Sequence, residues 1–197
     1  IYIIHFYVCG SYYEKIGDNI NCIDEEIPFY PPNGVTFIRF KKICELISGR
    51  DLARDEYNSN QIGIPYITGA SNLSNGNIKI SRWTNVPQVV TIKGDILLTC
   101  KGTVGEMAIN TFDKAHIARQ IMAIRNLYNL NIEYLSLCIY FYIEKIKMAA
   151  KGLIPGISRD DILNLILPVP SEQYQSKVVN SVNSLFKCIN DIEKSLS

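Results

Sequence analysis

The stretch from Pro168 to Leu196, PVPSEQYQSKVVNSVNSLFKCINDIEKSL, combines a helix stop with a helix that carries a narrow apolar seam. Pro168 and Pro170 exclude helix before Ser171, because proline lacks the amide hydrogen that an interior helical residue donates. Beyond them, apolar residues recur at alternating spacings of four and three: Val178, Val182, Leu185, Ile189, Ile192 and Leu196. This spacing keeps the six side chains on one face, which is the a/d pattern of a helix that packs lengthwise against another helix.

The predicted helix is long for a domain of this size. Ser171 is a favourable N-cap, and Glu172 follows in the first turn, where the helix dipole favours a negative charge. Residues 175–196 would span about 33 Å at about 1.5 Å per residue, roughly the length of one turn of B-DNA. Periodicity leaves two interpretations open: the helix pairs with a helix of a partner, or it packs on its own domain.

The residues before the prolines change from strands to helices. Short apolar runs separated by glycine, asparagine and other turn residues predict a mostly β, bent or barrel-like sheet between Val35 and Arg125. The expected strands are 65–68, 77–80, 89–92, 95–100, 106–110 and 120–124, and one helix is expected near Phe40–Ile47.

A helical period follows this β region. It places Ile132, Leu135, Ile139, Tyr142, Ile143 and Ile146 on one stripe and predicts a helix over 132–150 that is closed by Lys151-Gly152. Ser158 with Asp161 has the pattern of a capping box, which predicts a short helix through Leu163, and residues 165–169 return to strand.

These elements predict an α+β fold. A mostly β domain with a few helices occupies residues 27–170 and opens on the proline-rich segment Ile27–Gly34, and a long C-terminal helix that forms a coiled coil occupies residues 171–197. Residues 1–26 form an acidic lead segment that stays unassigned.

Composition favours a globular, cytoplasmic protein. Of the 197 residues, 47% are hydrophobic and 20% are charged, and we find neither an apolar run long enough to span a membrane nor a signal peptide. The six cysteines contain no CxxC pair and are expected to be reduced. Because the first residue is Ile1 rather than Met, the chain is expected to be a piece of something longer or to have lost its start.

Charge is distributed unevenly along the chain. Residues 1–26 have a net charge of −4, residues 27–130 carry 12 basic and 7 acidic groups, and residues 131–197 carry 7 of each. A basic middle segment is compatible with a polyanionic partner, although many proteins that bind no nucleic acid have a similar charge.

The sequence lacks the motifs of several enzyme classes. It has no P-loop and no GxGxxG fingerprint, and only two histidines, His5 and His116, neither of which has a second ligand at metal spacing. The segment Asp95–Lys101 has Thr99 where a metal-dependent nuclease would need a second acid, and Asn85–Gln88 lacks the Asn-Pro-Pro-Tyr loop of adenine methyltransferases. We therefore expect no catalytic residues, no metal and no cofactor in this chain.

Three polar clusters lie in the basic segment. Residues 101–105 place two glycines around Thr103, which suits phosphate contact or a hairpin corner with a glycine bulge. Residues 68–72 offer short hydrogen-bonding side chains, with Arg50 and Arg54 upstream, and His116, Arg119 and Gln120 precede a strand. Arg, Asn and Gln can pair bidentately with base edges in the major groove.

Five ordered motifs give these clusters a context. They are GIPYITGASNL at 63–73, KGDILLTCKGTVG at 93–105, HIARQIMAIR at 116–125, IPGIS at 154–158 and LPVPSEQ at 167–173. In this order and spacing, residues 27–196 resemble one half of the specificity (S) subunit of type I restriction-modification enzymes.

The resemblance implies a target recognition domain followed by a spacer helix. Its partners would be double-stranded DNA, methyltransferase (modification) subunits and a restriction subunit, with S-adenosylmethionine, ATP and magnesium bound by those other subunits. We predict DNA contacts for residues in the polar loops: Arg50, Thr68, Ser71, Asn72, Lys101, Thr103, Arg119 and Gln120. The seam from Val178 to Leu196 would pair with a second copy of the chain or with a second half-subunit.

The chain departs from the family pattern in three respects. Tyr174-Gln175-Ser176 stands after Gln173 where a basic residue is usual, residues 1–26 match nothing, and one recognition domain is present rather than two. The chain is thus expected to be a half-subunit that dimerises or a fragment. Two other interpretations stay open: the recognition part of a fused restriction-modification methyltransferase polypeptide, and a coiled-coil adaptor that does not bind DNA.

Overall fold

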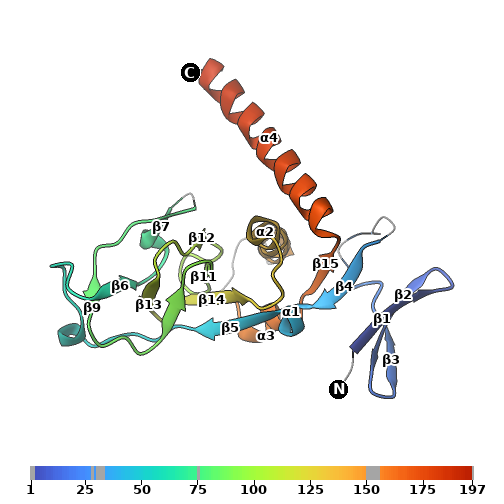
Figure 1. Cartoon of the computed structure of the whole chain (residues 1–197), viewed down its shortest axis with the longest axis horizontal. Coiled ribbons are helices and arrows are strands. Elements are labelled where there is room, and N and C mark those ends of the chain that lie inside the picture. The colour runs from blue at the N-terminus through green and yellow to red at the C-terminus, as the bar shows by residue number, and fades with distance from the viewer. Residues whose placement is uncertain (1–2, 28, 30–33, 75, 150–155, 197) are drawn as a thin grey trace. The chain divides into compact units, whose positions relative to one another are not determined.

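The computed structural model describes residues 3–27, 29, 34–74, 76–149 and 156–196 (Figure 1). The chain forms two compact units: Ile1–Lys42 together with Asn164–Ser197, and Ile43–Leu163. The second unit is therefore an insertion in the sequence of the first. The fold is α+β and mostly strand, with a long C-terminal helix, so the predicted fold class is confirmed.

The N-terminal residues, for which the sequence predicted no structure, form an antiparallel meander. Strand β1 (Ile3–Val8) pairs with β2 (Ser11–Ile16), which pairs with β3 (Asn19–Cys22). Cys9 and Gly10 connect the first two strands with positive φ angles of 50° and 90°. Two-residue connections of this kind follow the right-handed twist of the strands they join.

The first unit also contains two paired strands that lie far apart in sequence. Strand β4 (Thr36–Arg39) pairs antiparallel with β15 (Ile166–Val169), with Arg39 opposite Ile166 and Thr36 opposite Val169. The predicted strand over 165–169 is confirmed. Ile23, Ile27, Phe37 and Ile166 form a buried apolar cluster between these strands and the meander.

Arg39 is the polar centre of this unit. Its Nε and Nη2 donate to the two carboxylate oxygens of Glu14, each at 2.8 Å, while Nη1 and Nη2 donate to Glu26 at 2.6 and 3.2 Å. Nη1 also donates to the carbonyl oxygen of Asn164 at 2.8 Å. The side chains of Arg39 and Glu14 are only 10% and 3% exposed. The hydrogen bond to Glu14 raises the pKa of Arg39 above its usual value.

The C-terminal helix α4 (Glu172–Leu196) begins directly after β15. The hydroxyl oxygen of Ser171 accepts a hydrogen bond from the Tyr174 amide at 3.4 Å, which confirms the predicted N-cap. The buried Gln175 side chain donates to the carbonyl oxygen of Pro170 at 3.0 Å and anchors the first turn to the proline segment. The helix is continuous over its described length (Figure 1).

The second unit contains two four-stranded sheets and a small hairpin. In the first sheet the strand order is β10 (Val90–Ile92), β13 (Lys114–Ile117), β6 (Ile64–Ile67) and β9 (Trp83–Thr84). In the second sheet it is β12 (Met107–Ile109), β11 (Ile96–Thr99), β14 (Ile121–Asn126) and β5 (Cys44–Ser48). Strands β7 (Leu73–Ser74) and β8 (Asn77–Ile78) form the hairpin.

Apolar residues from both sheets form one core. Its buried members are Ile67, Leu73, Leu97, Ala108, Ala115, Ile117, Ile121 and Ala123. Each of the six predicted strands overlaps an observed strand, although β8 ends at Ile78 rather than at Ile80. The 3₁₀ helices η1 (Arg54–Glu56) and η2 (Ala70–Asn72) lie in the connections.

Two helices complete the second unit. Helix α2 (Ile132–Ala149) buries Leu135, Ile139, Tyr142 and Ile143 of the predicted stripe. Helix α3 (Arg159–Leu163) has the predicted capping box: the Asp161 carboxylate accepts from the Ser158 amide at 2.8 Å, and the Ser158 hydroxyl accepts from the Asp161 amide at 3.2 Å.

The predicted helix over Phe40–Ile47 is wrong beyond its first turn. Helix α1 covers only Phe40–Ile43, and the chain continues as β5, which pairs antiparallel with β14 from Cys44 opposite Asn126 to Ser48 opposite Met122. Side chains alternate along β5, with Cys44 and Leu46 buried and Glu45 exposed. Pairing with a strand almost eighty residues away therefore overrides the local helical pattern.

The two compact units divide the chain differently from the sequence-based domains. Residues 34–42 and 164–170 belong with the meander and α4 rather than with the recognition domain. Most of the proline-rich segment 27–34, the helix end at Lys151-Gly152, and Ile154-Pro155 of the fourth motif lie outside the described residues. In the part of the chain that the structure describes, no helix is long and apolar enough to span a membrane.

The Arg39 network predicts a large loss of stability on truncation. In Arg39→Ala, the Glu14 carboxylate would stay buried without its cation, and breaking a buried pair in this way costs about 3–5 kcal/mol. We expect urea unfolding monitored by circular dichroism to show this loss. The matched control is Arg119→Ala, which breaks an ion pair whose side chains are 71% and 45% exposed and should cost less than about 1 kcal/mol. Equal losses in the two variants would contradict a central role for Arg39.

Candidate functional site

Four strand ends and the loops that follow them meet in the second unit. Residues 49–51 follow β5, 68–72 follow β6, 100–103 follow β11 and 118–120 follow β13. Backbone hydrogen bonds connect these loops: Arg50 donates to Ile117 at 2.9 Å, Ala118 to Ile67 at 2.9 Å, and Cys100 to Gln120 at 2.8 Å. All eight residues predicted to contact DNA lie in these four loops. Their convergence could not be read from the sequence.

The exposed part of this region is called the strand-end surface below. It consists of Arg50, Asp51, Thr68, Ser71, Lys101, Thr103, Arg119 and Gln120, all exposed except the half-buried Thr68. Asp51 was not among the predicted site residues. The only signal for it in the sequence was its position directly after Arg50 in the basic segment.

Glycines allow the loops to approach one another. A Cβ atom at Gly49 would overlap the carbonyl oxygen of Ala118, so a side chain at this position would force the two loops apart. A Cβ atom at Gly69 would overlap Oε1 of Gln120, so the Gln120 side chain lies against the backbone of the 68–72 loop. Glycine is required at Gly49, where the clash is with backbone, whereas a side chain at Gly69 would only displace the flexible end of Gln120.

Asn72 organises its loop from the inside. It is 4% exposed, and its Oδ1 accepts hydrogen bonds from the amide and the hydroxyl of Thr68 at 2.8 and 2.9 Å. Its Nδ2 donates to the carbonyl oxygen of Lys79 at 2.7 Å. The geometry therefore favours a structural role for Asn72, whereas Ser71 next to it stays exposed.

Arg119 and Asp51 form an exposed pair on the strand-end surface. The Nε atom of Arg119 lies 2.8 Å from Oδ2 of Asp51, and the Arg119 amide donates to Oδ1 at 3.1 Å. Because both side chains are largely exposed, water screens the attraction and the pair can open at little cost. The Arg50 guanidinium and the Lys101 ammonium have no ion-pair partner among the described residues.

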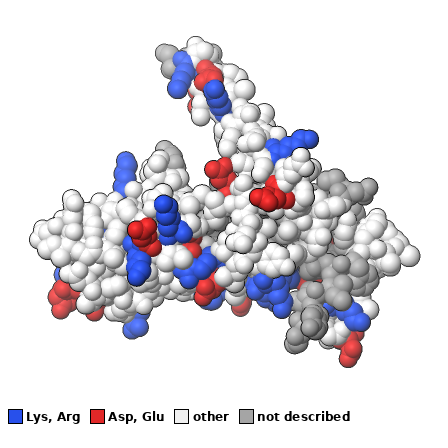
Figure 2. Space-filling model, viewed as in Figure 1, with Lys and Arg blue, Asp and Glu red and all other residues white. Residues whose placement is uncertain are grey.

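On the face of the molecule that Figure 2 shows, positive charge is local rather than continuous. Figure 2 shows Lys and Arg side chains in small groups that are interspersed with Asp and Glu. Arg125 is neutralised by the buried Asp95, whose carboxylate lies 2.9 Å from Nη2, and this hydrogen bond raises the pKa of Arg125. At the strand-end surface, the positive potential therefore depends mainly on Arg50 and Lys101, whose charges no ion pair neutralises among the described residues.

The described residues include two buried thiols, those of Cys44 and Cys100, and no candidate metal centre. No cluster of three or more His, Cys, Asp or Glu side chains that could hold a metal ion occurs among them. Burial raises the pKa of the Cys44 thiol to about 12 and raises that of Cys100. Both thiols are therefore poor nucleophiles at neutral pH.

His116 lies beneath the surface rather than on it. Its ring is fully buried, packs at a tilt against Tyr66 with 4.9 Å between ring centroids, and places Nδ1 2.8 Å from the carbonyl oxygen of Val89. Its Nε2 is buried and has no hydrogen-bond partner within the described residues. Burial lowers the pKa of His116, so the neutral ring is the form that the fold accommodates.

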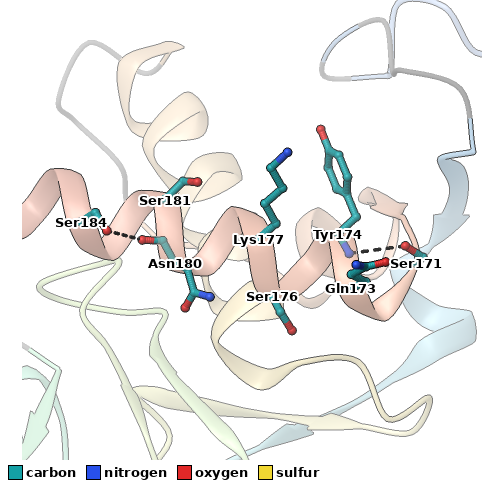
Figure 3. Close-up of a pocket in the computed structure, with 8 residues that line it drawn as sticks. All are labelled: Ser171, Gln173, Tyr174, Ser176, Lys177, Asn180, Ser181 and Ser184. Carbon is teal, nitrogen blue, oxygen red and sulfur yellow. Dashed lines mark hydrogen bonds between the residues drawn. The ribbon is translucent and has the colours of Figure 1, made fainter.

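Helix α4 has a different character in its two halves. Its first half is polar and lines a shallow groove of about 740 Å³, where Tyr174, Lys177 and Ser181 project from one side of the helix (Figure 3). In its second half the predicted seam is exposed, with Leu185, Ile189 and Ile192 at 64%, 50% and 58%, and Phe186 lies beside it. Val178 and Val182 are half-buried, and the Leu196 side chain lies outside the described residues.

Comparisons with known proteins agree with this architecture. The type I restriction modification DNA specificity domain family matches residues 32–197. The chain belongs to this family. The amide of Ile157, in the motif at 154–158, donates to the carbonyl oxygen of Cys100, in the motif at 93–105, at 2.9 Å. Two of the five ordered motifs therefore contact each other beside the strand-end surface.

Individual family members are distant in sequence. A putative type I restriction enzyme MjaX specificity subunit from Methanocaldococcus jannaschii is 22% identical over 151 residues, which cover 74% of this chain and 34% of that protein. The structure of the HsdS subunit from Thermoanaerobacter tengcongensis has a TM-score of 0.75 and 20% identity over 86% of this chain and 42% of that one. The type I S subunit from M. genitalium has a TM-score of 0.56 and 19% identity over 83% and 42%. The chain thus spans less than half the length of these relatives.

The buried His116 predicts a pH dependence of stability. Its folded pKa is below the usual 6.5, so its contribution to stability is present above pH 6.5 and is lost as the pH falls through the folded value. In His116→Asn, the difference in Tm between pH 7.5 and pH 5.5 should be smaller than in the unmodified chain. Because the two proteins differ only at residue 116, contributions from other titrating groups cancel in the comparison. An unchanged pH dependence would show that His116 does not titrate in this way.

Proposed function

We propose that this chain recognises a DNA sequence as the non-catalytic specificity component of a type I restriction-modification system. The observation that carries the proposal is the convergence of four strand-end loops, which gathers cationic, amide and hydroxyl side chains on one exposed surface. Such side chains are the ones that contact base edges and phosphates. Family membership over residues 32–197 supports the same role.

The strand-end surface suggests a division of labour. Arg119 and Gln120 have the donors and acceptors for bidentate contacts, with guanine and adenine respectively. In the free chain Arg119 is held by Asp51, so binding would exchange the carboxylate for a base edge. Arg50 and Lys101 would contact phosphates, while Thr68, Ser71 and Thr103 would add hydroxyl contacts. Asn72 would act by holding the loop in shape.

Helix α4 would set the spacing of two reading domains. Its second half exposes apolar side chains from Leu185 to Ile192, and helices in proteins gain most of their stability by packing such a face. Pairing with the same helix of a second copy, or of a second half-subunit, would bury this seam. The methyltransferase and restriction subunits would bind S-adenosylmethionine, ATP and magnesium and would carry out the chemistry in the cytoplasm.

The first test concerns sequence reading. Methylation mapping in cells with and without the gene would identify the target motif, and binding of the assembled complex to that motif can then be compared with binding to a scrambled duplex. Gln120→Ala should lose about 1–3 kcal/mol of discrimination between the two, because a bidentate base contact is removed. Lys101→Ala is the control and should weaken binding to both duplexes alike. Absence of binding to any duplex at low salt would instead favour the adaptor interpretation.

The second test concerns pairing through α4. Leu185→Glu or Ile189→Glu places a charge in the exposed seam and should convert a dimer to a monomer in light scattering. Asn183→Glu adds the same charge outside the seam and should leave the dimer intact. Circular dichroism should show that the second unit remains folded in all three variants, while the seam variants lose the stabilisation that pairing provides. A dimer that persists in the seam variants would exclude pairing through these residues.

A further inference from the structure

A second cationic site lies on the connection between β5 and β6 and on the approach to β9. The guanidinium carbons of Arg54 and Arg82 each lie 4.9 Å from the ring centroid of Tyr57. The two guanidinium carbons therefore cannot be farther apart than twice that distance. Because 28 residues separate the two arginines in sequence, only the fold brings them together.

The arginines border a preformed pocket. It has a volume of about 130 Å³ and is lined by Arg54, Tyr57, Asn58, Ser59, Ser81 and Arg82. The Asn58 side chain holds its wall: Oδ1 accepts from the amides of Asn60 and Ile62 at 2.9 and 3.2 Å, and Nδ2 donates to the carbonyl oxygens of Ile62 and Trp83 at 2.8 and 3.2 Å. The pocket thus exists before any ligand binds.

The two arginines of the pocket are not engaged in ion pairs with the acidic residues near them. Among the described residues, no ion pair joins Arg54 or Arg82 to a carboxylate, although Asp55 and Glu56 follow Arg54 in the chain. Glu56 is engaged elsewhere, because its Oε2 accepts from the Ala53 amide at 2.7 Å. Two guanidinium groups held on one ring repel each other, and an anion between them would turn this repulsion into attraction.

The pocket is linked to the strand-end surface through aromatic rings. Tyr57 packs against Tyr66 in a tilted arrangement with 5.5 Å between centroids, and Tyr66 packs against His116 in the same manner at 4.9 Å. Tyr66 lies in β6 and His116 in β13, opposite each other in the parallel pairing of these strands. The same two strands lead to the 68–72 and 118–120 loops. A contact made at the pocket would therefore fix the position of the loops that read the sequence.

We propose that Arg54, Tyr57 and Arg82 form a binding site for a phosphate of the DNA backbone that sets the register of the strand-end surface on the duplex. This inference rests on the proposed function. Guanidinium groups suit phosphate because they offer parallel N–H donors, and stacking on Tyr57 orients those donors at little entropic cost. The neighbouring hydroxyl groups of Ser59 and Ser81 add donors to the same pocket. Contacts to phosphate position a protein on DNA, whereas contacts to bases specify the sequence.

The test measures the affinity of the assembled complex for the target duplex and for a scrambled duplex as a function of salt. Arg54→Gln and Arg82→Gln should each weaken binding to both duplexes by the same factor. Losing one phosphate contact lowers the slope of log affinity against log salt by about 0.9, which corresponds to about an eightfold change per tenfold change in salt concentration. The control Lys114→Gln removes an exposed charge at the opposite end of β13 and should leave the slope unchanged.

A matched pair of variants tests the role of the aromatic ring. Tyr57→Phe keeps the ring that both arginines contact and should bind DNA like the unmodified complex. Tyr57→Leu removes the ring while both arginines remain, and it should lower affinity for both duplexes. Thermal unfolding of each variant checks that the second unit is still folded.

The outcomes separate this inference from the proposed function. Unchanged affinity and salt slope in both arginine variants would overturn the phosphate site, even if Gln120→Ala still reduces discrimination. Loss of discrimination with an unchanged salt slope would also overturn it, because the arginines would then read bases. If inorganic phosphate raises Tm only when both arginines are present while DNA affinity does not depend on them, the pocket binds a small anion and the inference is wrong. If the unmodified complex binds no duplex, the proposed function itself fails.

Discussion

The pairing of β4 with β15 is the constraint on which the rest of the structure depends. Residues 36–39 and 166–169 lie more than 120 residues apart. Their antiparallel pairing joins the two segments of the first unit, which flank the inserted unit Ile43–Leu163 in the sequence. Arg39 stabilises this closure from within, because its donors reach Glu14, Glu26 and the Asn164 carbonyl. Only Pro170 and Ser171 separate the end of β15 from the start of helix α4, so the same pairing determines where that helix begins.

In the second unit, the residues that hold the loops differ from those that could contact a ligand. Gly49, Gly69 and Asn72 are internal and permit or enforce the close approach of neighbouring loops. Arg119, Gln120 and Lys101 are exposed, and the pair that Arg119 forms with Asp51 is screened by water. Such an arrangement allows the exposed side chains to vary without loss of the fold, which is what recognition of different sequences by one architecture requires.

Helix α4 shows how the same periodic pattern can have different roles along one helix. Of the seam residues, Val178 and Val182 are half-buried near its start, whereas Leu185, Ile189 and Ile192 are exposed near its end. The seam in the sequence is uniform, so its periodicity alone could not distinguish packing within the chain from pairing with a partner. The difference arises because the fold covers only the first turns of the helix.

The sequence by itself determined the elements that depend on local physics: six strands marked by turn residues, helix α2, the capping box of α3, and the start of α4 at Ser171. The polar clusters in the sequence also predicted DNA contacts for eight residues, and the four loops that contain these residues are brought together by the fold. Only the tertiary structure decided that residues 44–48 form a strand, that Asn72 points inward, and that Arg54 and Arg82 share one aromatic ring. The physical reason is that these features arise from partners distant in sequence or from burial, and neither leaves a periodic signal in the chain.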